Sequence, residues 1–391
     1  MHIQKVILKK NEEIRILEGH PWIFSNEVLA FEGHIVSGEI CDVYTWDKTF
    51  IGCGFLNTSS KIMVRMLSFQ HIEINLEFFK SRIYDAYMYR KNVRFDNNYR
   101  VVFGEADLLP GLIVDKYGDY LSIQVLSLGM EKNKDLIVQA LIEIFHPLGI
   151  MERSDVSVRK KEGLEERKQI LYPKSFNPIV TIEENGVFIK VDLENGQKTG
   201  YFLDQKTNRA ALERYVKEKN VLDCFSHTGG FSLHALHYGA KSATAVDISE
   251  KACKDILENA KLNHFEENIE IVCADVFDFL HDEKNKGKYD VIVLDPPAFT
   301  KSKETIEKAY RGYKEINMHA LQLLEHNGIL FTFSCSQHMT PALFLEMLKE
   351  AAKDAKKMVQ MIDFKIQSPD HPTRLGGDES LYLKCVILRV L

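Results

Sequence analysis

The chain has 391 residues, of which 45% are hydrophobic and 27% are charged, and its formal net charge is −6. This length suits two or three domains with sizeable cores, and the composition excludes a disordered or fibrous protein. The net negative charge excludes a protein that binds nucleic acid through a uniformly basic surface. A local basic cleft remains compatible with this charge.

Membrane, targeting and metal signals are missing from the sequence. No stretch approaches the roughly twenty apolar residues of a membrane span. The N-terminal residues have no apolar signal core, so we expect no targeting peptide. The seven cysteines are scattered without metal-type spacing, so we expect neither a disulfide framework nor a metal site. We therefore predict a cytoplasmic protein without a membrane or metal partner.

Residues 1–71 show short apolar runs separated by glycine-containing turns. This pattern is typical of a small β-barrel or sandwich, and we predict one domain here. The predicted strands are KVILKK, IRILEG, GEICDVYT, FIGCGFLN and KIMVRMLS.

Residues 72–190 begin with a long helix, predicted over 72–96 from apolar positions at helical spacing. Arg82, Arg90, Lys91 and Arg94 give it a basic face. Either the helix is a connector whose basic face is exposed to solvent, or this face forms one wall of a nucleic-acid groove.

A small α+β domain is predicted after this helix, in the order strand–strand–helix–strand–strand. Its helix, KNKDLIVQALIEIF, is ended by proline and glycine, and the charged run DVSVRKKEGLEERK is expected to be an exposed loop. The run VTIEENGVFIKVDL predicts a hairpin that turns at Asn185 and Gly186.

Residues 191–391 alternate helices with buried strands. This alternation predicts a doubly wound α/β domain with ligand sites at the carboxyl ends of its parallel strands. The predicted strands are VLDCF, SATAVDI, IEIVCADV, DVIVLDPP, GILFTFSC, MVQMIDFKI and LYLKCVILRV.

The first of these strands carries an acid, Asp223, and leads into a glycine-containing loop. The loop includes Phe225, Ser226, Gly229 and Gly230. Its glycines let the backbone approach a ligand. The G-x-G-x-x-G spacing is missing, and Asp223 would repel a pyrophosphate. A cationic, amine-bearing cofactor fits better, so we predict S-adenosylmethionine.

Acids at the tips of the next two strands support a nucleoside site. Asp247 ends the second strand and is expected to bind the ribose hydroxyls. Asp275 and Val276 follow the third strand and are expected to face the adenine. Parallel strands bring such tips to one edge of a sheet.

Groups suited to a nucleobase follow the fourth and fifth strands. Asp295, Pro296 and Pro297 make a rigid turn whose carboxylate can bind the polar edge of a flipped base, with Phe299 close behind. Cys335 stands at the tip of the fifth strand, next to hydroxyl groups that can support a thiolate. We therefore interpret it as a reactive cysteine, although most buried cysteines are structural.

A thiolate in this position predicts methylation at C5 of a pyrimidine. Attack at C6 makes C5 nucleophilic, and Asp295 can hold N3 and the exocyclic amine. The residues do not identify the base that removes the C5 proton.

A basic and aromatic segment lies between these two strands. Lys301, Arg311, Tyr313 and Lys314 suit phosphates and stacked bases. A solvated helix face explains the same pattern equally well.

Seven segments, in this order, carry a family resemblance over almost the whole chain. They are HPWIF, FGEADLLPGLIVDKYGD, GQKTGYFLDQKTNR, CFSHTGGFS, DPPAFTKSK, RGYKEIN and FSCSQHMT. Together they resemble the bacterial 23S ribosomal RNA large-subunit methyltransferase I family of cytosine-C5 enzymes. The resemblance implies a PUA domain, a middle strand–strand–helix–strand–strand domain and a Rossmann-like methyltransferase domain.

The resemblance also implies roles and partners. Cys335 matches the family's nucleophile and Asp295 its base-binding acid, while Tyr201, Phe202 and Asp204 match residues packed over the cofactor site. The implied methyl donor is S-adenosylmethionine, the substrate is 23S ribosomal RNA and the assembly is a homodimer.

Two other functions stay open at this point. Ala298 stands where two-cysteine RNA enzymes carry a second cysteine, and a related family with a similar loop methylates guanine N7, which needs no thiol. A noncatalytic RNA-binding assembly factor is the third reading, against which Asp223, Asp247, Asp295 and Cys335 all argue.

Overall fold

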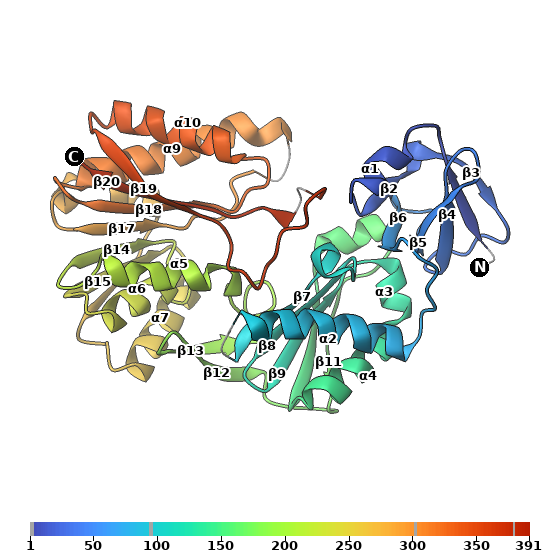
Figure 1. The fold of residues 1–391 in the computed structure, drawn as a ribbon. Coiled ribbons are helices and arrows are strands. Elements are labelled where there is room, and N and C mark those ends of the chain that lie inside the picture. Colours follow the sequence, from blue (N-terminus) through green and yellow to red (C-terminus); the bar gives the residue numbers. More distant parts are fainter. Residues whose placement is uncertain (1–3, 94–96, 301–302, 378–379) are drawn as a thin grey trace. The chain divides into compact units, whose positions relative to one another are not determined.

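The computed structural model describes residues 4–93, 97–300, 303–377 and 380–391 (Figure 1). They form two compact units. The first comprises Met1–Val180, Val191–Leu203 and Pro369–Ser380, and the second Thr181–Lys190, Asp204–Ser368 and Leu381–Leu391. No helix among the described residues is long and apolar enough to cross a membrane.

The N-terminal part of the first unit is a six-stranded sheet in the order β2-β6-β5-β4-β1-β3. Its strands are β1 (Lys5–Leu8), β2 (Trp22–Phe24), β3 (Val28–Glu32), β4 (Ile40–Tyr44), β5 (Phe50–Leu56) and β6 (Ile62–Ser68). The predicted β domain is therefore confirmed, with β2 and β3 in addition to the expected strands.

One predicted strand of this domain, IRILEG, is wrong. Residues Glu13–Leu17 form the short helix α1, in which only Ile16 is buried. Ile14 and Ile16 alternate as in a strand, and five residues are too few for a helical period to show in the sequence.

Helix α2 (Leu76–Asn92) begins later than predicted, and Arg94 of the predicted basic face lies outside the described residues. The helix begins after Asn75, whose side chain accepts a hydrogen bond from the backbone N–H of Phe78 at 3.0 Å. Arg90 is fully buried, and its guanidinium binds both carboxylate oxygens of Asp107 at 2.6 and 2.8 Å. Arg90 therefore stabilises the fold and does not face a nucleic-acid groove.

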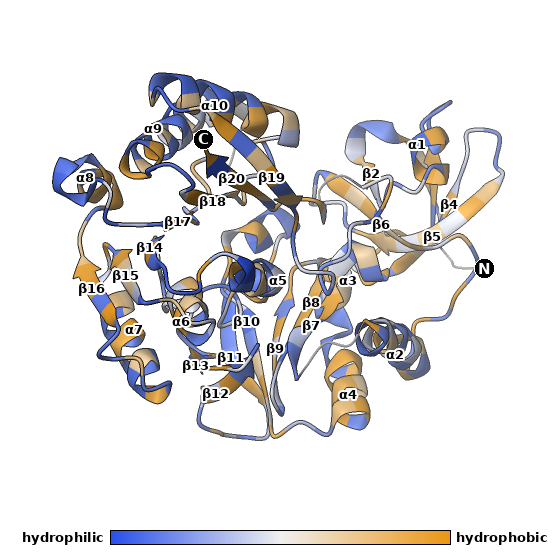
Figure 2. Ribbon diagram, turned by 60° about the vertical axis from the view of Figure 1, so that its left-hand side comes forward, coloured by the Kyte–Doolittle hydropathy of each residue, from blue (hydrophilic) through white to orange (hydrophobic). Residues whose placement is uncertain are grey.

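A five-stranded sheet, β11-β10-β9-β8-β7, also belongs to the first unit, together with α2, α3 and α4. The elements are β7 (Asn98–Phe103), β8 (Leu112–Tyr117), β9 (Tyr120–Val125), α3 (Leu128–Lys132), α4 (Lys134–Phe145), β10 (Gly149–Ser154) and β11 (Arg167–Tyr172). Three strands precede the helices, where the sequence predicted two, and β10 and β11 were not predicted, because the two strands expected after the helix are those of the hairpin described below. Buried side chains of α4, hydrophobic along most of its length in Figure 2, join those of α2 and the sheet in one core.

The charged run 155–168 is largely exposed, as the sequence predicted, but it is not a loop throughout, because Ser157–Glu162 form a 3-10 helix and β11 begins at Arg167. Arg159 is fully buried and donates hydrogen bonds to the carbonyls of Val125 and Glu165 and to the Glu131 carboxylate. A buried guanidinium with this many acceptors fixes the segment in place.

The predicted hairpin is confirmed as a separate two-stranded sheet of β12 (Ile179–Glu184) and β13 (Val187–Asp192). Asn185 and Gly186 have φ angles of 50° and 84°. Both are left-handed, as a two-residue hairpin turn with this sequence requires.

The second unit is built on a seven-stranded sheet in the order β16-β15-β14-β17-β18-β20-β19. Strands β14 to β18 are parallel, and β20 pairs antiparallel with both β18 and β19. The strands are β14 (Asn220–Cys224), β15 (Ser242–Asp247), β16 (Ile269–Cys273), β17 (Val291–Leu294), β18 (Ile329–Ser334), β19 (Val359–Lys365) and β20 (Lys384–Val390). Every strand predicted beyond residue 219 is present.

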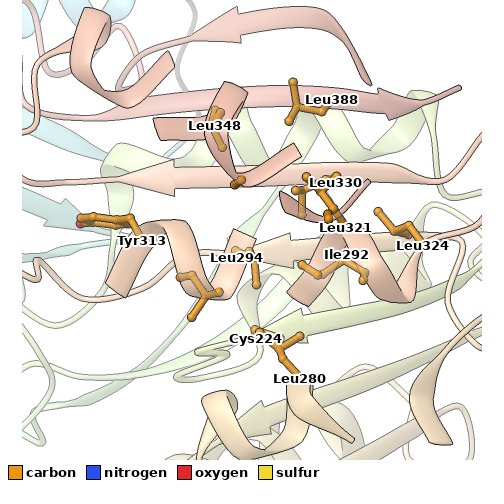
Figure 3. Packing of buried hydrophobic residues seen from close by; sticks show 14 of the residues in the cluster. Cys224, Leu280, Ile292, Leu294, Tyr313, Leu321, Leu324, Leu330, Leu348 and Leu388 are labelled. Carbon is orange, nitrogen blue, oxygen red and sulfur yellow. The ribbon is translucent and has the colours of Figure 1, made fainter. Parts of the chain in front are cut away.

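Helices cover both faces of this sheet. Alternate strand residues point to opposite sides, so both faces carry apolar side chains that pack against helices. Leu222, Leu294 and Leu330 pack with one set of helices, α8, α9 and α10, whereas Val221 and Phe331 belong to a second cluster with α6. Figure 3 shows the first cluster. The helices are α5 (Lys206–Ala210), α6 (Gly230–His237), α7 (Glu250–Leu262), α8 (Val276–His281), α9 (Ile306–Leu323) and α10 (Pro341–Asp354).

Candidate functional site

The candidate site lies at the carboxyl edge of the parallel strands. Strand β14 pairs with β15 on one side and with β17 on the other, so the strand order reverses at β14. Ligands of open α/β sheets bind at such a reversal, outside the strand ends. Asp223, Asp247 and Asp295 are all carried to this edge.

Asp223 is buried, with 1% of its surface exposed. Its Oδ2 accepts hydrogen bonds from the backbone N–H and the hydroxyl of Ser232, at 3.0 and 2.7 Å. Its Oδ1 is buried and has no hydrogen-bond partner among the described residues. Burial, opposed by Ser232 and reinforced by the nearby Asp295 and Asp247, raises the pKa of Asp223 to about 7.

The loop after β14 has the backbone of a tight ligand-binding turn. Phe225, His227 and Gly229 all have positive φ angles, of 63°, 52° and 81°. The Ser226 hydroxyl bonds to the carbonyls of Asp223 and Val246, at 2.6 and 3.1 Å, which ties the loop to β15. A Cβ on Gly229 would lie 3.2 Å from Ile256, so glycine keeps the loop close to α7.

Asp247 and Asp275 occupy the neighbouring strand tips, as predicted. Asp247 is partly exposed and accepts hydrogen bonds from the backbone N–H groups of His227 and Ser249, each at 2.9 Å. Asp275 is exposed and caps α8 through the N–H of Phe277 at 2.7 Å. The side chain of Val276 is buried, with 3% exposed, and belongs to the core cluster.

The Asp295–Phe299 turn follows β17 directly. The Oδ1 of Asp295 accepts a hydrogen bond at 2.9 Å from Gln205, whose own side-chain oxygen accepts one at 2.7 Å from Asn208. Both amides are buried. Pro296 is buried, Pro297 is exposed and Phe299 is partly buried. The sequence analysis missed Gln205, although it lies in the GYFLDQ segment.

Cys335 is partly buried at the tip of β18, and its sulfur lies 3.9 Å from the carbonyl oxygen of Pro296. The structure therefore brings the predicted thiol and the Asp295–Pro296 turn together. A second residue that the sequence analysis missed is Lys384 on β20, a buried lysine beside this strand tip.

The residues matched to the cofactor site in the GYFLDQ segment fall on both sides of a unit boundary. Tyr201 and Phe202 belong to the first unit, where Tyr201 is buried and Phe202 packs with Lys198. Asp204 belongs to the second unit and is buried, and it accepts a hydrogen bond from the Tyr382 hydroxyl at 2.5 Å.

The predicted phosphate- and base-binding side chains of α9 lie in different environments. Tyr313 is fully buried among the residues of the core cluster (Figure 3). Its ring centroid lies 4.6 Å from that of Phe299. Its ring is thus part of the core and not an exposed stacking platform. Lys314 pairs with Glu350 and Asp354 of α10, at 3.1 and 2.8 Å, whereas Arg311 is exposed. Lys301 lies outside the described residues.

The strand tips fit the cofactor predicted from the sequence. The unpartnered oxygen of Asp223 is buried in a site where a cationic amine would supply the missing hydrogen bond and charge. Asp247 still has an exposed face, and carboxylates bind ribose hydroxyls in such positions. We conclude that this edge can hold an amine-bearing nucleoside.

One other group of side chains has the composition of a metal site. His281 of α8 and Glu315 and His319 of α9 place one ligand atom each within 4.8 Å of one another. His281 Nε2 also lies 3.7 Å from the Glu315 carboxylate, which makes an ion pair when the imidazole is protonated. An ion pair explains the grouping as well as a metal does.

Comparisons with known proteins agree with this architecture. Residues 6–69 match the PUA-like domain, and residues 173–389 match the S-adenosylmethionine-dependent methyltransferase family. Ribosomal RNA large subunit methyltransferase I of Vibrio vulnificus is 42% identical over 393 aligned residues, covering 99% of both chains. The protein of that name from Aeromonas salmonicida is also 42% identical, over 98% of both.

A solved structure shares the fold. It is SMU.776, described as a methyltransferase and complexed with SAH, and it matches with a TM-score of 0.83 and 24% identity. The match covers 99% of this chain and 100% of that one.

Proposed function

Because this chain belongs to the ribosomal RNA large subunit methyltransferase I family and its C-terminal part to the S-adenosylmethionine-dependent methyltransferases, we propose that it methylates C5 of a cytosine in 23S ribosomal RNA. S-adenosylmethionine is the cofactor of the family. The observation that carries the C5 assignment is the placement of Cys335 against the Asp295–Pro296 turn.

Cys335 is the nucleophile of the proposed reaction. Its thiolate forms a bond to C6 of the cytosine, and the electrons of the C5–C6 double bond move so that C5 becomes nucleophilic. When bound, S-adenosylmethionine supplies an electrophilic methyl group. Removal of the C5 proton by a base restores the double bond and expels the thiolate, so Cys335 is regenerated.

Asp295 and Gln205 position the base. The Asp295 carboxyl can hold N3 and the exocyclic amine of cytosine, and a hydrogen bond there stabilises the charge that develops on the ring. Gln205 holds one oxygen of this carboxyl, and Asn208 holds Gln205. The carboxyl is therefore oriented before the RNA binds.

Asp223, Asp247, Asp275 and the Ser226–Gly230 loop are proposed to hold the cofactor. The Asp223 carboxylate faces its amine and the Asp247 carboxylate its ribose. The backbone at Gly229 and Gly230 lies alongside, and Asp204, which belongs to the same unit, is proposed to contribute to the site. We assign RNA contacts to Pro297, Phe299 and Arg311, and we expect Tyr313 to act by supporting Phe299. We also propose a cytoplasmic homodimer.

Nucleoside mass spectrometry tests the proposal. 23S ribosomal RNA from a strain lacking this protein is incubated with the purified protein and labelled S-adenosylmethionine. We expect labelled 5-methylcytidine from the wild type and none from Cys335→Ala. Cys273→Ala serves as the matched control, because Cys273 is an exposed thiol at another strand end.

Two outcomes would assign another function. Labelled 7-methylguanosine, undiminished in Cys335→Ala, would replace the thiolate mechanism by direct transfer to guanine N7. Cofactor binding without any labelled nucleoside would indicate a noncatalytic RNA-binding role.

A further inference from the structure

Lys384 is a lysine in an environment that ordinarily excludes charge. Its surface is 1% exposed, and its ammonium donates hydrogen bonds to the carbonyl oxygens of Ser336, at 2.6 Å, and Tyr382, at 2.8 Å. Both acceptors within the described chain are neutral. Burying an ammonium without an anion is costly, so a neighbouring group that can become negative would be strongly favoured.

The position of Lys384 points to Cys335 as that group. Lys384 lies opposite Ser334 in the antiparallel pairing of β20 with β18, so it stands beside the strand end that carries Cys335. Its hydrogen bond to the carbonyl oxygen of Ser336 also fixes the residue that follows the cysteine. A cation held next to a thiol favours the thiolate.

We propose that the Lys384 ammonium stabilises the thiolate of Cys335 and holds the tip of β18 in place, which makes Lys384 a positioning residue for the nucleophile. The thiol proton leaves to water, the sulfur keeps the electron pair, and the lysine stays protonated. The assignment of a nucleophilic role to this thiolate rests on the proposed function, but its stabilisation does not.

The electrostatics of the neighbouring groups agree with this geometry. Burial lowers the pKa of Lys384 to about 8, and the charge on Cys335 opposes that change. Tyr313 of α9 also interacts with Cys335, and burial raises the pKa of Tyr313 to about 12, so it is neutral at pH 7. Asp295 follows the adjacent strand β17 and brings a carboxyl group to the same sheet edge. Lys384 is a cation beside this strand end that can favour the thiolate.

The test measures alkylation of Cys335 by iodoacetamide between pH 5.5 and 9, in the full-length protein without RNA. Iodide leaves as the sulfur–carbon bond forms, and peptide mass spectrometry gives a rate for each cysteine. The variants are Lys384→Met and Lys384→Arg. Lys357→Met is the matched control, because Lys357 also donates to a backbone carbonyl, that of Leu324 at 2.7 Å. Cys273 is an exposed internal control in every digest.

In the wild type, we expect the Cys335 rate to rise with an apparent pKa below the ordinary thiol value of about 8.5. Lys384→Met should raise that pKa and slow alkylation at pH 7 about tenfold, as a change of one pKa unit implies. Lys384→Arg should restore much of the rate, and Lys357→Met and the Cys273 profile should be unaffected.

An ordinary or raised Cys335 pKa in the wild type would overturn the proposal without any variant. So would a Lys384→Met profile that matches the wild type in a protein whose thermal unfolding is cooperative. If Lys384→Met does not fold, the wild-type profile and Lys384→Arg still decide the matter. Retained cytosine methylation in Cys335→Ala would remove the proposed function while leaving this result intact.

Discussion

Ser232 donates two hydrogen bonds to a single oxygen of Asp223, from its backbone N–H at 3.0 Å and from its hydroxyl at 2.7 Å. The other carboxylate oxygen is buried without a partner in the described chain. This asymmetry anchors the carboxyl while leaving one oxygen for a ligand. Because an unsatisfied buried acceptor destabilises the protein, the arrangement is favourable mainly when a cation binds.

Asp223→Asn should stabilise the cofactor-free protein at pH 8. Burial raises the pKa of Asp223 to about 7, whereas the unfolded chain gives it the ordinary value of about 4. Between these values the folded state binds more protons than the unfolded state, so stability falls as pH rises through that window. Thermal unfolding should show a higher midpoint for Asp223→Asn at pH 8 and little difference at pH 4. A midpoint difference that does not change with pH would contradict the raised pKa.

The affinity for S-adenosylmethionine should depend on the same ionisation. The cofactor's amine favours the charged carboxylate, so binding should weaken as pH falls below about 7. Calorimetric titration between pH 5.5 and 8 measures this dependence in the wild type. In Asp223→Asn, affinity should drop by about tenfold to a hundredfold, the loss expected for a hydrogen bond to a charged group, and its pH dependence should flatten. If the affinity of this variant depends on pH as strongly as that of the wild type, the titration belongs to another group.

Gln205→Leu should reduce methylation while leaving the fold intact. The substitution removes the 2.9 Å hydrogen bond to Asp295, so the carboxyl loses its fixed orientation. Misplacement of about 1 Å can cost about a hundredfold in rate. Single-turnover assays should show a slower methyl-transfer step with unchanged cofactor affinity. Gln139→Leu, an exposed glutamine on α4, is the control, and equal activity losses in the two variants would remove the positioning role.

RNA containing 5-fluorocytidine should trap the protein covalently. Fluorine at C5 cannot leave as a proton does, so the thiolate–C6 bond persists after methyl transfer. A denaturing gel should show a protein–RNA band with the wild type and S-adenosylmethionine, and no such band with Cys335→Ala. Trapping through a different cysteine would reassign the nucleophile.

Arg209→Met should destabilise the second unit by about 3–5 kcal/mol, because it removes the guanidinium that pairs with a buried carboxylate. Arg209 binds both oxygens of Glu184, at 2.6 and 3.0 Å, and both side chains are buried. Urea unfolding measures the difference. Lys251→Met breaks the exposed pair with Asp255 and should cost less than about 1 kcal/mol. Equal losses of unfolding free energy in the two variants would contradict the prediction that the buried ion pair contributes more than the exposed one.

Periodicity alone was sufficient to predict the methyltransferase sheet. Apolar runs such as Val291–Leu294 are buried on both faces, and such runs are typical of parallel strands. The acids and the thiol that follow these runs could therefore be assigned to one edge of the sheet. The short helix Glu13–Leu17 was misread because local alternation is ambiguous over five residues. Arg90 and Arg159 were placed on the surface because their buried partners are distant in sequence.

The sequence by itself therefore determined the class of fold, the cofactor and the strand-end residues, because these depend on local pattern and on motifs in order. Tertiary structure alone decided that Gln205 holds Asp295, that Tyr313 lies in the core and that Lys384 stands beside Cys335. Each of these relations joins residues far apart in the chain. Contacts of this kind depend on strand order and burial, and neither is encoded in any single segment.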